Sequence, residues 1–120
     1  MQLSGPMPNA HVRHLCSELV SIACMNSSRR LHAIAGNLEE IGEWSALVLA
    51  DAPIRCGTKV RVACERFQLR GLVESCTFEE LLGFFVRVRL DPESRWSQQW
   101  FTPKHLFALL EQRPAAAGCA

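Results

Sequence analysis

Residues 57–64, which read GTKVRVAC, hold the clearest strand signal in the chain. Valines at positions 60 and 62 and the cysteine at 64 alternate with the cations Lys59 and Arg61. Because successive side chains of a strand point to opposite faces, this alternation is typical of a strand with one buried face. Gly57 is a turn residue just before it, so the stretch predicts a turn followed by a half-buried strand.

Five further stretches on either side also have strand character, with apolar runs or alternation bounded by turn residues. Gly71, inside one of them, is typical of a bulge or a tight bend in a barrel. Short strands that follow one another without intervening helices favour an antiparallel barrel or sandwich. We therefore expect a mainly all-β fold, a six-stranded antiparallel barrel. The five other predicted strands cover residues 17–25, 30–38, 46–50, 67–78 and 84–90.

The pattern changes near the C-terminus. Thr102 followed by Pro103 is typical of a helix N-terminus, and apolar residues at 106, 107, 109 and 110 have helical spacing. Pro114 would end such a helix, so the sequence predicts a C-terminal α-helix after the barrel. We expect three parts along the chain: a flexible tail over residues 1–14, the domain over 15–112, and a disordered tail over 113–120.

The overall composition limits the range of functions. The chain has 120 residues, enough for one domain, and a net charge of +1, which gives no whole-chain attraction to nucleic acid or an anionic membrane. No apolar run approaches the roughly 20 residues that a membrane span needs, and residues 1–14 lack the pattern of a signal peptide. We therefore expect a cytoplasmic protein without membrane insertion, whose six cysteines stay reduced.

No arrangement of residues points to catalysis or to a metal. The four histidines stand in no recognisable catalytic motif, and neighbouring carboxylates such as Glu39 and Glu40 would point to opposite faces of a strand. The sequence has no phosphate-binding glycine loop and no Cys-x-x-Cys pair. We therefore expect a protein that is not an enzyme and holds neither a cofactor nor a metal.

Four stretches of the predicted strands form a pattern with a known counterpart. They are residues 45–49 (SALVL), 53–62 (PIRCGTKVRV), 70–73 (RGLV) and 83–88 (GFFVRV). In this pattern the chain resembles the PilZ domain family from about residue 15 to residue 109. The resemblance implies a six-stranded PilZ-like split β-barrel closed by a C-terminal α-helix. Most members bind cyclic diguanylate, a bacterial second messenger, through an RxxxR loop before the barrel and a [D/N]xSxxG motif on an early strand.

The strand motif of the family is replaced in this chain. Counting back from the Gly-Thr turn, it falls on residues 40–45, where Glu40, Gly42 and Ser45 stand in place of the acid or amide, the serine and the glycine. A register three residues earlier, 37–42, keeps Asn37 and Gly42 but puts Glu39 at the serine position and breaks the spacing to the turn. In either register a carboxylate would face a dianionic ligand, which costs energy.

The arginine motif is replaced as well. No RxxxR occurs near the N-terminus, where Arg13 stands alone, and the pair Arg29 and Arg30 follows the first predicted strand instead of preceding it. If cyclic diguanylate binds, these three arginines are the cations within reach, and the candidate nucleotide contacts are Arg13, Arg29, Arg30, Glu40, Gly42 and Ser45.

Basic and aromatic residues favour a different use of the barrel surface. Arg61, Arg87 and Arg89, together with Lys59, alternate outward and predict a basic face. Trp44, inside the replaced strand motif, is a candidate anchor for a partner. A barrel that binds single-stranded nucleic acid usually exposes several aromatic rings between its charges, so we expect a protein partner before a nucleic acid. The sequence thus favours a PilZ-like regulatory or adaptor domain, with a cyclic diguanylate receptor as the alternative.

Overall fold

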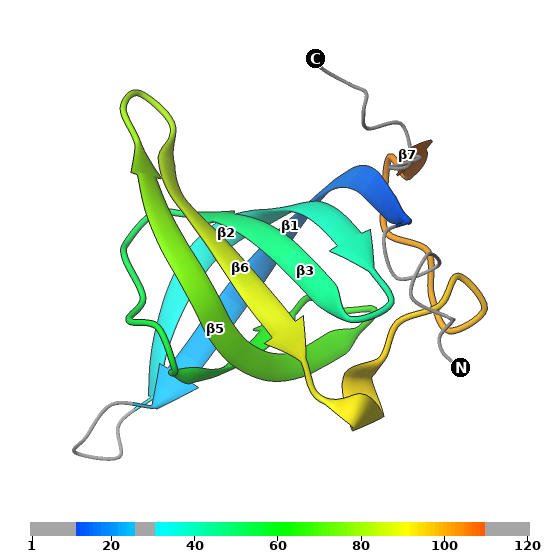
Figure 1. Ribbon diagram of the computed structural model, residues 1–120, viewed down its shortest axis with the longest axis horizontal. Coiled ribbons are helices and arrows are strands. Elements are labelled where there is room, and N and C mark those ends of the chain that lie inside the picture. The colour runs from blue at the N-terminus through cyan, green and yellow to red at the C-terminus, as the bar shows by residue number, and fades with distance from the viewer. Residues whose placement is uncertain (1–11, 26–30, 110–120) are drawn as a thin grey trace, which may run out of the picture.

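The computed structural model describes residues 12–25 and 31–109. Over these residues the chain forms antiparallel strands and one short 3-10 helix (Figure 1). Residues 1–11 of the tail expected over 1–14, and the tail expected over 113–120, lie outside the described part. The elements are β1 (Arg13–Met25), β2 (Leu31–Gly42), β3 (Ser45–Ala50), β4 (Lys59–Ala63), β5 (Gln68–Glu79), β6 (Gly83–Leu90), η2 (Pro92–Ser94) and β7 (Phe107–Leu109).

The first six strands close into a barrel. The sheet runs in the order β2-β3-β6-β5-β4-β1-β7, and β1 also pairs with β2, which joins the two ends of the six-strand set. All of these pairings are antiparallel. In Figure 1 the strands wrap around a common interior, and the β5–β6 hairpin extends beyond one end. The predicted six-stranded antiparallel barrel is confirmed.

Alternation along each strand fills the barrel interior. In β4, Val60 and Val62 are buried while Lys59 is exposed, as the sequence of this strand predicts. Every strand from β1 to β6 contributes buried aliphatic residues, and burying one such side chain stabilises the fold by roughly 1.5–3 kcal/mol. The fully buried side chains include Ile22, Leu38, Ile41, Val48, Val62, Leu69, Val86 and Val88.

Gly71 has a different role from the one its position in a strand suggests. The irregularity in β5 lies between Val73 and Ser75, not at the glycine. A Cβ at Gly71 would lie 2.1 Å from the carbonyl oxygen of Arg89 and 2.8 Å from Cγ1 of Val88. The missing side chain therefore lets β5 and β6 approach closely, and the bulge follows two residues later.

The predicted C-terminal helix is wrong over residues 102–109. The segment instead runs as a loop to β7, which pairs with the first residues of β1. Pro103 is fully buried, the Lys104 carbonyl accepts a hydrogen bond from the Ser17 N–H, and His105 has a φ of 57° that no α-helix contains. Pairing with the edge of β1 therefore stabilises this segment more than the helix that its local pattern favours. Residues 110–112 of the predicted helix lie outside the described part.

Aromatic packing holds this segment on the barrel. Trp96 is buried, and its indole N–H donates to the Phe101 carbonyl at 3.0 Å. The ring of Phe101 stacks on that of Phe67, with centroids 4.1 Å apart.

Arg13 and His14, which we expected in the N-terminal tail, belong to β1. Among the residues that the structure describes, no helix is long and apolar enough to cross a membrane.

Candidate functional site

A carboxylate between two arginines marks the outer face where the resemblance puts a nucleotide. Glu40 Oε1 on β2 lies 3.1 Å from Nη1 of Arg13 on β1 and 3.7 Å from Nη2 of Arg87 on β6. The sheet register explains the cluster, because Arg87 and Glu40 both lie opposite Leu47 of β3, one on each side. With 17% of its side chain exposed, Glu40 is a half-buried acceptor that both cations share.

Four of the six candidate nucleotide contacts lie around this cluster. Gly42 is the register partner of Arg13, and Ser45, which begins β3, is the register partner of Arg89. Arg13, Glu40, Gly42 and Ser45 therefore share one end of the barrel.

The other two candidate contacts belong to a different part of the chain. Arg29 and Arg30 lie outside the described residues. The strand ends that flank them, Met25 and Leu31, are paired at the opposite end of the β1–β2 hairpin from Arg13 and Gly42.

Trp44 lies on the turn between β2 and β3 with 41% of its surface exposed. The guanidinium carbon of Arg95 is 5.1 Å from the centre of its ring, within the range of a cation–π contact. Arg95 also pairs with Glu43, next to Trp44. The sequence analysis missed Arg95 because nothing in the local pattern links it to a residue half the chain away. An indole held by a guanidinium is a preformed, partly exposed contact surface.

The predicted basic face is present, with a different membership. Arg61 on β4 lies directly opposite Arg70 on β5, while Lys59 lies opposite Leu72, whose other neighbour is Arg89 on β6. Arg87 also lies on the outer side of β6, as predicted, but it forms an ion pair with Glu40. We name the set Lys59, Arg61, Arg70 and Arg89 the basic face. Within the described ranges, no acidic side chain forms an ion pair with any member.

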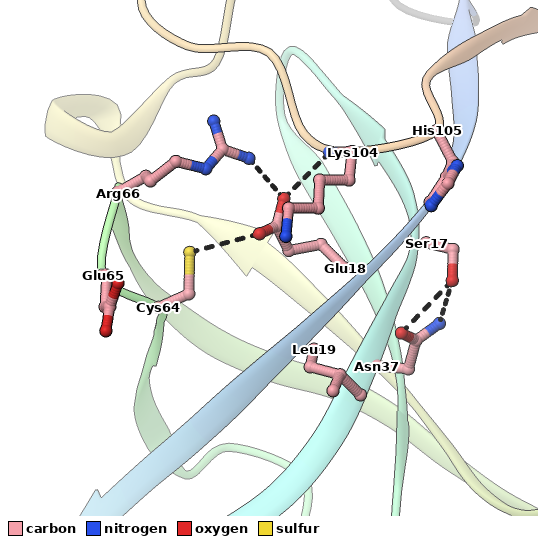
Figure 2. A pocket seen from close by; sticks show the side chains of 9 residues that line it. All are labelled: Ser17, Glu18, Leu19, Asn37, Cys64, Glu65, Arg66, Lys104 and His105. Carbon is pink, nitrogen blue, oxygen red and sulfur yellow. Dashed lines mark hydrogen bonds and ion pairs between the residues drawn. The ribbon is translucent and has the colours of Figure 1, made fainter.

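A buried carboxylate that sequence reasoning missed lies elsewhere, on the edge of β1 (Figure 2). Glu18 has 7% of its surface exposed and accepts hydrogen bonds from Nη2 of Arg66 at 2.5 Å and from the backbone N–H of Lys104 at 2.8 Å. The thiol of Cys64 lies 3.8 Å from its other oxygen. Burial raises the pKa of Glu18, but the Lys104 N–H and the Arg66 guanidinium outweigh it, so the net pKa is lowered.

This arrangement ties the C-terminal segment to the barrel. Glu18 fixes the loop before β7 on the barrel, beside a pocket of about 530 Å³, and its donors hold it in the charged form. The nearby thiol of Cys16 is also a poor nucleophile. Burial, assisted by the charge of Glu39, raises the pKa of this thiol to about 12, so the reactive thiolate is scarce at neutral pH.

Neither a metal site nor a relative identifies the chain. No group of three or more histidine, cysteine, aspartate or glutamate side chains within the described ranges is arranged to hold a metal ion. Comparison with protein-family models, with curated proteins and with solved structures gave no significant match in any of the three.

Proposed function

We propose that the chain is a non-catalytic, cytoplasmic PilZ-like regulatory or adaptor domain in bacterial cyclic-diguanylate-type signalling. In this proposal it acts through contacts with another protein, and the nucleotide binding usual in the family is lost. The observation that carries the proposal is the carboxylate of Glu40 between Arg13 and Arg87.

The charge at this position opposes a phosphate ligand. A phosphate that used the two arginines would displace Glu40 from ion pairs of 3.1 and 3.7 Å, or would lie beside its negative charge. Either arrangement is unfavourable, because charge-assisted hydrogen bonds are lost or like charges are brought together. Arg13, the arginine nearest in sequence to the place of the family's RxxxR motif, is therefore already paired with a carboxylate of the barrel.

The basic face supports a protein partner with acidic side chains. Arg61 and Arg70 are like charges on directly opposite positions, an arrangement that destabilises a sheet unless an anionic group lies across it. The neighbouring Leu72 is half-buried and gives the face an apolar centre. Only one aromatic ring, that of the half-buried Phe85, comes from the same outer side of β6, which favours protein over single-stranded nucleic acid.

Isothermal titration calorimetry with cyclic diguanylate tests the loss of nucleotide binding. We expect no binding by the native chain at micromolar concentrations, and binding by the Glu40→Gln variant, in which Arg13 and Arg87 no longer share a carboxylate. Micromolar or tighter binding by the native chain would overturn the adaptor proposal.

Fluorescence anisotropy tests the partner class, with a labelled glutamate-rich peptide and a labelled mixed-sequence RNA as the two probes. We expect the peptide to bind, and the Arg70→Glu variant to lose that binding. Lys104→Glu is the matched control, because Lys104 is exposed and lies outside the basic face, on the loop before β7. Tighter binding of the RNA, with a steep dependence on salt, would replace the protein partner by a nucleic acid.

A cyclic diguanylate receptor is the second candidate, and one observation favours it. Arg13, Gly42 and Ser45 share one end of the barrel, and Arg89 is the register partner of Ser45. A ligand there would have to draw the arginines away from Glu40. This reading requires that the native chain bind cyclic diguanylate and that Arg13→Ala remove the binding, whereas the adaptor proposal requires that neither occur.

A further inference from the structure

The β5–β6 hairpin projects past the end of the barrel (Figure 1). Its turn carries large, exposed apolar side chains. Leu81 at its tip is 100% exposed, Leu82 is 61% exposed, and Phe78 just before the turn is 59% exposed. Such a group of large apolar side chains on a protruding element is typical of a contact surface.

The backbone conformation at the tip of the hairpin disfavours the leucine found there. The Leu82 N–H donates to the Glu79 carbonyl at 3.0 Å and closes the turn. Leu81, at the third position of that turn, has a φ of 77°, a conformation that glycine or asparagine adopts far more readily than leucine. Leucine therefore brings backbone strain and gains no burial within one copy of the chain. A contact with another surface would supply the missing burial.

A groove of about 560 Å³ lies on the same hairpin, next to its turn. The hairpin contributes Cys76, Phe78 and Phe84, and the loop after β3 contributes Ile54, Arg55 and Cys56. The rings of Phe78 and Phe84 are 5.0 Å apart. The groove is therefore apolar, and it carries the positive charge of Arg55 beside it.

We propose that a second copy of this chain occupies the groove, with the tip of each hairpin seated in the groove of the other. Leu81 and Leu82 match the apolar lining, and the acidic pair Glu79 and Glu80 beside them matches the charge of Arg55. Tip and groove belong to one hairpin, so a two-fold arrangement uses both contacts twice, as a symmetric dimer requires. The contact is small, so the dimer is weak and depends on concentration. It does not rest on the proposed adaptor function.

Sedimentation equilibrium over a range of concentrations tests the association. We expect the native mass to rise from the chain mass of 13.4 kDa towards twice that value. Leu81→Asn should stay monomeric, since asparagine fits the positive φ but cannot fill the groove, and Arg55→Glu should weaken the dimer at least tenfold. Leu19→Asn is the matched control, because Leu19 is 80% exposed and lies on β1, outside the hairpin. This variant should dimerise like the native chain.

Disulfide trapping tests how the two copies are seated. In the Leu81→Cys variant under mild oxidation, we expect a bond between position 81 of one copy and Cys56 of the other, found by peptide mapping and lost in the Cys56→Ser background. A native chain that is monomeric at every concentration would leave the groove to a foreign apolar segment and overturn the proposal. So would a Leu81→Asn variant that dimerises normally, or trapping of position 81 only to itself.

Discussion

Arg61 on β4 and Arg70 on β5 are register partners on neighbouring strands. Neither forms an ion pair with an acidic side chain in the described part of the chain. Like charges at directly opposite positions cost stability, and Arg89 on β6 adds a third cation on the same face. A partner with negative charge on this face would offset the repulsion between the two arginines. The pair is therefore both a stability defect and the centre of the proposed contact surface.

Replacing one member of the pair should stabilise the free protein. In Arg70→Glu the residue opposite Arg61 becomes an opposite charge, which we expect to raise the free energy of unfolding by about 0.2–1 kcal/mol. Urea unfolding at neutral pH measures it. In dilute solution, where the chain is monomeric, Arg55→Glu, at an exposed position outside the basic face, should leave the free energy nearly unchanged. Equal effects of the two substitutions would show that net charge matters and the pairing does not.

Glu18 predicts an acid-sensitive contribution to stability. Because its pKa is lowered in the folded state, its stabilising effect is fully present above the ordinary value of 4.5 and is lost as the pH falls through the lower folded value. Glu18→Gln removes the charge that Arg66 and the Lys104 N–H bind, and we expect it to cost about 1–3 kcal/mol at neutral pH.

The test of this linkage is the pH dependence of the difference between the two proteins. Urea unfolding of native and Glu18→Gln chains should show a gap that is constant near neutral pH and narrows below about pH 4.5. A gap that stays the same in acid would mean that shape, not charge, is what Glu18 contributes.

Two glycines should respond to alanine for different reasons. A Cβ at Gly71 would lie 2.1 Å from the Arg89 carbonyl oxygen, so β5 and β6 must move apart, and we expect a loss of about 3 kcal/mol or more. Gly57 has nothing within 4 Å of a Cβ but a φ of 87°, so its loss should be about 1–2 kcal/mol. Thermal unfolding of both variants measures the order, and a larger loss at Gly57 would contradict it.

The strands were predictable because their signal is local. Alternation located β3 and β4 to within one residue at each end, and the six-strand count follows from it. The C-terminal segment was not predictable in the same way. Its apolar spacing favours a helix, but the edge of β1 and the Glu18 carboxylate, both far away in sequence, hold it as a loop and a strand.

The site depended on information that alternation does not contain. The sequence indicates that Arg61 points outward, but only the pairing register puts Arg70 opposite it. The same holds for Glu40, whose two arginine partners come from the start of the barrel and from its last long strand. Residue types could be predicted from the sequence, whereas their neighbours required the closed barrel.

Leu81 offers a prediction that separates stability from association. Its φ of 77° costs leucine about 1 kcal/mol relative to a residue suited to this conformation, and its side chain is entirely exposed. In dilute solution, where the chain is monomeric, Leu81→Asn should therefore raise the free energy of unfolding by up to about 1 kcal/mol and the midpoint by about 4 °C. Differential scanning calorimetry at increasing concentration should show the native midpoint rising towards that of the variant, because dimerisation stabilises only the native chain. A variant that is less stable at every concentration would mean that Leu81 supports the hairpin within a single copy.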